Sequence, residues 1–167
     1  MSIARTFKKT VFASAITAIL PHVAFAATIT VSPSSPDQIS LPDATGVVDE
    51  ILFETNGQTV EKHLGANKDI DKLTVTNGLT LDDQSGTSGK IIFHMSAKEI
   101  NLGATNYGSA WDNPSSCDNE LYIESNTLTA NGGTKTAFSL NKGSIVDLDV
   151  ADKVSINSDS KTAFYLD

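Results

Sequence analysis

The chain of 167 residues has one cysteine, one arginine and no long apolar run. Cys117 has no second cysteine to pair with, so an internal disulfide cannot stabilise the fold. Arg5 is the only arginine, and 20 acidic residues outnumber 12 basic ones. A chain this acidic lacks the basic surface that nucleic acid or anionic lipid requires, and neither is expected as a partner.

The segment 1–26 has the pattern of a secretory signal peptide. Three basic residues precede an apolar run from Val11 to Leu20. This run has 10 residues, whereas a helix that spans a membrane needs about 20. Ala24 and Ala26 form an A-x-A cleavage site ahead of Ala27. The pattern predicts export through the inner membrane, with the protein in the periplasm in transit and then at the cell surface, in the outer membrane or outside the cell.

Removal of this leader leaves the segment 27–167, which has the length of one domain. All three charges of the leader are basic, so nine lysines then face 20 acids and the formal charge is −11. Such a charge fits an acidic, solvated surface outside the cell. No transmembrane helix is expected in the mature chain.

Short runs with alternating apolar residues follow one another along the rest of the chain. Examples are Leu73 and Val75, which alternate with threonine, and Ile100 and Leu102. This period of two, with many Thr, Val and Ile residues, predicts an all-β protein. Residues 27–66 hold three prolines that suit a sheet edge, so they are expected to cap the N-terminal end. The polar residues 61–72 could form a short helical turn. Residues 67–167 are expected to form the regular part.

The end of the chain repeats itself. "TKTAFSL" at residues 134–140 returns as "SKTAFYL" at residues 160–166, an offset of 26. Periods of about 20–50 residues mark repeat architectures. With three short strands and no helix per period, the repeat predicts a parallel β-helix, in which each period is one coil. An antiparallel β-sandwich is the competing all-β interpretation.

Stacked coils lie about 4.8 Å apart, so equivalent residues of two coils should lie one above the other. The repeat aligns Phe138 with Phe164, Leu140 with Leu166, and, at a corner of the coil, Asn131 with Asn157. Slightly upstream, Leu121 aligns with Leu148 at an offset of 27.

The stretches "NGLTLDD" and "NKGSIVDLDVADKVSIN", together with the leader, resemble the N-terminal part of a bacterial autotransporter passenger domain of the pertactin-like type. The resemblance implies a right-handed parallel β-helix, carried to the cell surface by type V secretion through a C-terminal outer-membrane barrel. This sequence has no such barrel and ends within a coil at "TAFYLD". The expected fold is therefore a β-helix truncated at its C-terminal end, from a fragment or a truncated gene.

The resemblance implies display rather than catalysis: an adhesive or structural scaffold whose partner is a host surface protein or glycan. Tyr107 and Trp111 share a loop rich in glycine, asparagine and proline, which is the candidate partner contact. The alternative is a secreted β-helical enzyme, a protease or a polysaccharide-degrading enzyme, with its active site outside this chain.

No catalytic residue is predicted within the chain itself. Ser85 and Ser88 lie near glycines, but neither has the G-D-S-G or G-x-S-x-G setting of a serine nucleophile. His63 and His94 could serve as a base, yet nothing in their spacing connects them to each other or to a serine.

No metal or cofactor is predicted either. Asp147 and Asp149 should share the outward face of a strand, and Asp152 follows on the next turn. Calcium prefers clustered carboxylates, but this spacing matches neither an EF-hand loop nor a calcium-binding nonapeptide. These acids are therefore expected to form a solvated face.

Overall fold

The computed structural model describes residues 27–87, 89–103, 111–112, 119–134, 136–140, 143–159 and 164–166. Within these residues all regular structure is β-strand, as the sequence predicts. The strands are β1 (Ala27–Val31), β2 (Gln38–Ile39), β3 (Val47–Phe53), β4 (Val60–Leu64), β5 (Lys72–Val75), β6 (Leu79–Asp83), β7 (Ile91–Gly103), β8 (Trp111–Asp112), β9 (Glu120–Asn131), β10 (Phe138–Leu140), β11 (Ile145–Asn157) and β12 (Phe164–Leu166). No helix in this part of the chain could cross a membrane, because it contains none.

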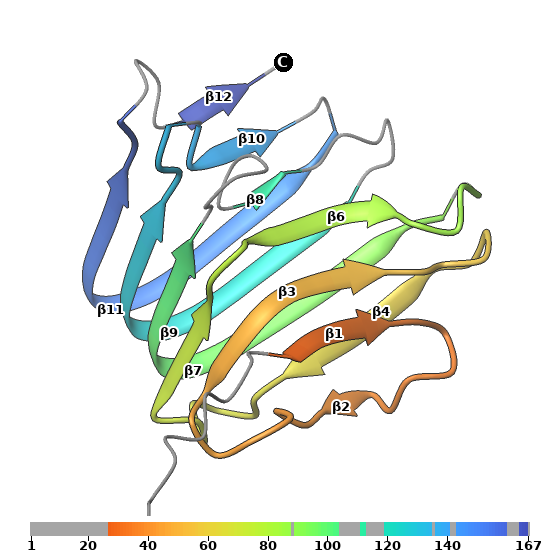
Figure 1. Ribbon diagram of the computed structural model, residues 1–167, viewed down its shortest axis with the longest axis horizontal. Helices are drawn as coiled ribbons and strands as arrows, with labels where there is room; N and C mark the ends of the chain where they lie inside the picture. The colour runs from red at the N-terminus through yellow and green to blue at the C-terminus, as the bar shows by residue number, and fades with distance from the viewer. Residues whose placement is uncertain are drawn as a thin grey trace, which may run out of the picture.

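The strands stack as successive coils of a parallel β-helix (Figure 1). The first face of the stack consists of β2, β4 and the first halves of β7, β9 and β11. The second face continues through β5 and the second halves of the same long strands. The third face holds β1, the end of β3, β6, β8, β10 and β12. All of these pairings are parallel, which confirms the β-helix and excludes the antiparallel sandwich.

The register places the repeated residues of the last coils side by side. β10 pairs with β12 so that Phe138 lies opposite Phe164 and Leu140 opposite Leu166. β9 pairs with β11, and their last residues, Asn131 and Asn157, are partners.

The alignment of Leu121 with Leu148 is wrong. Leu121 lies opposite Val146, an offset of 25, and Leu148 lies opposite Ile123. The reason is a bulge in β11 between Val150 and Lys153, where β11 has one residue more than β9. The sequence offset of 26 therefore holds only beyond the bulge.

One apolar core fills the interior of the stack. Inward residues of all three faces contribute to it, and 24 hydrophobic residues are buried among those that the structure describes. Phe53 of the third face meets Phe93 of the first face edge to face, with 5.1 Å between ring centroids, and neither ring is exposed. Burial of apolar side chains between faces is the main favourable term for a fold without disulfides.

The segment 27–66, expected to be a cap, contributes β1 to β4 to this stack. Residues 61–72, for which the sequence allowed a short helical turn, contain no helix: β4 continues to Leu64 with alternating burial, and β5 begins at Lys72. Lys62 takes an inward position with only 9% of its side chain exposed, and its Nζ reaches Asp37 Oδ1 at 2.9 Å. The aliphatic stem of Lys62 thus covers the core while its charge meets a carboxylate at the surface.

Candidate functional site

A row of polar and aromatic residues runs across the outward side of the first face. The row takes one residue from each successive coil: Gln38, His63, His94, Tyr122 and Asp147 are register partners on β2, β4, β7, β9 and β11. Alternate residues such as Leu64, Met95 and Ile123 point into the core. Because side chains of a strand alternate between its two sides, the parallel register alone aligns this row on the surface.

Three rings of the row stack on one another. The centroids of His63 and His94 are 4.2 Å apart with 12° between ring planes, and those of His94 and Tyr122 are 4.7 Å apart with 11°. His94 therefore lies between two rings, and its orientation is fixed from both sides.

A groove of about 370 Å³ opens beside these rings. Its lining includes all three rings and three acids, Glu124, Asp147 and Asp149. The last two point outward, as their strand parity predicts, while Val146 and Leu148 pack against the core. The groove thus combines flat aromatic walls with carboxylates.

A hydrogen bond and an ion pair hold the Tyr122 ring in place. The Tyr122 hydroxyl donates to Glu120 Oε2 at 2.9 Å, and Lys90 Nζ lies 2.6 Å from Glu120 Oε1. The hydrogen bonds from Lys90 and Tyr122 lower the pKa of the Glu120 carboxyl, and the same carboxylate raises the pKa of Tyr122. Tyr122 accordingly stays protonated and donates to an ionised acid.

His94 is neutral near pH 7. Partial burial lowers its pKa, the charge of His63 lowers it further, and Glu61 opposes both effects. His94 Nε2 lies 3.4 Å from Glu61 Oε1, but the atom is buried and makes no hydrogen bond within the described part of the chain.

The serines and histidines considered for catalysis have different surroundings. The Ser85 hydroxyl donates to Asp83 in the turn after β6, whereas His63 and His94 stack on each other across β4 and β7. Ser88 lies outside the described residues. No pair of histidine and serine forms in the described residues, so the geometry assigns no serine nucleophile there.

Asp83 instead organises the glycine-rich turn after β6. Its carboxylate accepts hydrogen bonds from Thr55 N at 3.1 Å and Thr55 Oγ1 at 2.5 Å, and from Ser85 N at 2.9 Å and Thr87 Oγ1 at 2.8 Å. Burial raises the pKa of Asp83, but the hydrogen bonds from Ser85 and Thr55 outweigh it and hold the pKa well below its ordinary value. The turn is therefore tied to the preceding coil by an ionised acid.

Asp83→Asn should lower the free energy of unfolding by about 1–2 kcal/mol at pH 7, because it removes charge-assisted hydrogen bonds to a partly exposed carboxylate. A carboxyl with a lowered folded-state pKa contributes its stability above the unfolded-state value of about 3.9 and loses it as the pH falls further. Urea unfolding should therefore show a constant difference from the wild type above pH 5, about one unit beyond that value, and a shrinking one below pH 4. Glu54→Gln, at an exposed acid of the preceding coil, is the control, and an equal effect of both substitutions would contradict the role of Asp83.

The other residues named from the sequence are placed as follows. Asp152 is exposed on β11, and Trp111 lies on β8, whose backbone pairs with Leu79 and Phe138. Ala27 begins β1. Ala24, Ala26, Tyr107 and Cys117 lie outside the described residues.

Two features escaped the sequence reasoning. The first is the contact between His63 and His94, whose offset along the chain is longer than the visible repeat. The second is Asn119, a fully buried residue whose Oδ1 accepts from Ile91 N at 2.9 Å and whose Nδ2 donates to Leu81 O at 2.7 Å. An asparagine beside a loop gives no sign in the sequence that it will bridge two coils.

Comparison of the chain with known family models, curated proteins and solved structures found no match. The fold and the geometry of the groove are therefore the observations from which a function can be proposed.

Proposed function

We propose that the chain is an exported, non-enzymatic β-helical display scaffold, the start of a surface passenger like those of autotransporters. The leader pattern in residues 1–26 supports export, and the acidic composition supports a location outside the cytoplasm. The parallel stack agrees with the fold that the resemblance implies.

The observation that carries the proposal is a constant strand register combined with a variable coil length. On the first face the length of the coil varies along the chain. The register partners are Gln38 with His63, Val60 with Ile91, Ile92 with Glu120, and Glu120 with Ile145, which are 25, 31, 28 and 25 residues apart. The connections between strands take up much of the difference. Residues 65–71 separate β4 from β5, whereas β7 and β9 continue without a break, and the link from β6 to β7 (residues 84–90) is longer than that from β10 to β11 (residues 141–144). In a scaffold of this kind, loops of different length and sequence can present different contact surfaces on an unchanged core.

Display also agrees with the surface of the first face. The outward row described above holds polar and aromatic groups that a protein or glycan partner could contact. Its residues are Gln38, His63, His94, Tyr122 and Asp147. Aromatic rings beside carboxylates suit contacts with sugars, whose hydroxyls donate to acids and whose ring faces pack on aromatics.

An insertion experiment tests export and scaffolding together. The full chain, with a short epitope inserted after Gly86 and a C-terminal tag, would be expressed in a Gram-negative bacterium. We expect the mature protein to begin at Ala27, to leave the cytoplasm and to expose the epitope in a protease-resistant fold. The same epitope after Ile123, inside β9, is the control and should abolish the fold. Retention in the cytoplasm with residues 1–26 attached, or equal tolerance of both insertions, would overturn the proposal.

A further inference from the structure

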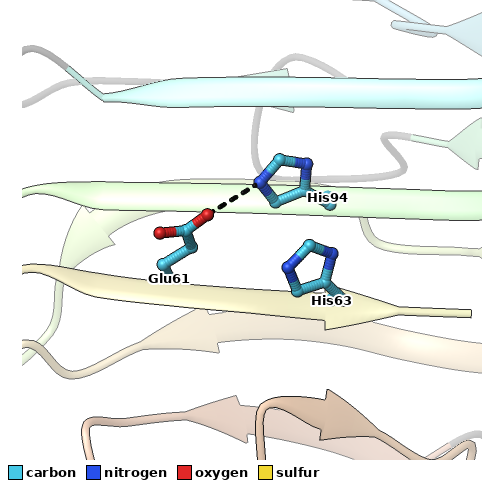
Figure 2. Close-up of side chains that lie close together, drawn as sticks. All are labelled: Glu61, His63 and His94. Atoms are coloured by element: carbon cyan, nitrogen blue, oxygen red, sulfur yellow. Dashed lines mark ion pairs between the residues drawn. The ribbon is translucent and has the colours of Figure 1, made fainter. Parts of the chain in front are cut away.

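Glu61, His63 and His94 form the one group of three metal-ligating residues that gathers within the described parts of the chain. Glu61 and His63 are two positions apart on β4 and therefore share its outward side. His94 lies on β7 directly opposite His63. One donor atom from each residue lies within 4.8 Å of the others, and Figure 2 shows the carboxylate and both rings on the same side of the two strands.

We propose that these three residues bind a first-row divalent transition ion, with Zn²⁺ as the best fit. Two imidazoles and one carboxylate are a ligand set that zinc takes at open sites, where water completes the coordination. Calcium and magnesium prefer oxygen-only ligand sets, so the two imidazoles select against them.

One distance in the cluster already matches such an ion. Ligand atoms about 2.1 Å from zinc at the tetrahedral angle lie about 3.4 Å apart. His94 Nε2 and Glu61 Oε1 are 3.4 Å apart, without the geometry of a hydrogen bond. His94 Nε2 is thus a buried polar atom that lacks a hydrogen bond within the described chain and points toward a carboxylate, which is the arrangement that an ion between them would complete.

The surroundings position His94 before an ion binds, whereas the His63 ring, now stacked parallel to it, must turn for its nitrogen to point at the same ion. Tyr122 stacks on the far side of the His94 ring and is itself fixed by its hydrogen bond to Glu120. The backbone pairing of Val60–Leu64 with Ile91–Met95 fixes both strands. Glu61 is 58% exposed at its side chain, so its carboxylate can turn aside to admit an ion from solvent to His94 Nε2, which is itself buried.

The ion would join two successive coils. Glu61 and His63 belong to one coil, and His94 belongs to the next. In a fold that has no internal disulfide, an ion held by two coils stabilises the folded state because the unfolded chain does not preform the site.

The test is a titration of the metal-free full chain with ZnCl₂ and, in parallel, with CoCl₂. His22→Gln is included in every sample, so that His63 and His94 are the two remaining histidines. We expect one equivalent of Zn²⁺ to bind, the midpoint of thermal unfolding to rise, and Co²⁺ to give the visible absorption bands of a four-coordinate site. CaCl₂ and MgCl₂ should cause no comparable rise.

The variants Glu61→Gln, His63→Ala and His94→Ala should each weaken Zn²⁺ binding at least about tenfold. Loss of a residue that only hydrogen-bonds to a metal ligand already lowers metal affinity by about this factor, and loss of a direct ligand should lower it no less. Glu124→Gln, which removes another acid of the groove, is the matched control and should bind as the parent does. In the unmutated ligand set, Co²⁺ should also shift the ring proton signals of both His63 and His94, a readout that does not depend on any ligand variant folding. Absence of Zn²⁺ binding, equal binding by all three ligand variants and the parent, or ring signals that Co²⁺ leaves unchanged would overturn the proposal.

Discussion

Phe93→Ala should lower the free energy of unfolding by about 3–5 kcal/mol, the cost of removing a fully buried aromatic side chain. Phe93 has no exposed surface and contacts Phe53 edge to face across the interior, so its removal breaks the contact between the first and third faces. An aromatic pair of this kind contributes about 0.5–1.5 kcal/mol beyond the buried area. The measurement is urea unfolding followed by circular dichroism.

Two further substitutions make this result specific to the interior. Ile92→Ala changes the neighbouring residue of the same strand, which points outward and is half-buried, so its cost should be less than half as large. Phe93→Leu keeps an apolar side chain at the site and should fall between the wild type and Phe93→Ala, which provides a measurement even if alanine prevents folding. If Phe93→Ala and Ile92→Ala unfold at the same urea concentration, the ring does not have the packing role that the structure gives it.

The class of the fold could be predicted from the sequence because strand parity and the terminal repeat are local signals. Alternation in segments such as Ile145–Asn157 indicates which side chains face inward, and the offset of 26 indicates how far apart stacked residues lie. Both depend on a few neighbouring residues. The register of Phe138 with Phe164 is visible for this reason, since no bulge lies between the aligned strands there.

The candidate metal site could not be predicted in the same way. Its formation depends on the length of the coil between His63 and His94, which is longer than the visible repeat because of its connections. One residue more or less in that coil would place His94 on the inward side of β7, since side chains alternate along a strand. Spacing in the sequence therefore cannot connect two histidines until the length of every turn between them is known.

The same limit explains the error at Leu121. A single extra residue in β11 raises the offset from 25 before the bulge to 26 after it, whereas the alignment of Leu121 with Leu148 assumes 27. Nothing in the residues between Val150 and Lys153 distinguishes a bulge from a regular strand. Contacts made by long-range turns, such as the bridge from Asn119 to Ile91 and Leu81, are hidden for the same reason.

Close stacking of coils also predicts a large loss of stability on substitution of Gly65, which follows β4. Its φ is +79°, and a Cβ atom built on it would lie 1.9 Å from the carbonyl oxygen of Ser96 on the next coil. Gly65→Ala should therefore cost about 2–5 kcal/mol, from the strain of an alanine in the left-handed region and from the displacement of the β7 backbone.

Gly86→Ala separates these two contributions, because Gly86 also has a positive φ, +72°, but its Cβ would meet no atom within 4 Å. Its cost should be limited to the conformational strain of about 1–2 kcal/mol. The difference between the two variants in urea unfolding measures how closely one coil must approach the next. Equal losses would mean that the backbone of β7 moves away from Gly65 without cost, which the pairing of β7 with β4 up to Met95 and with β9 at Ser96 does not allow.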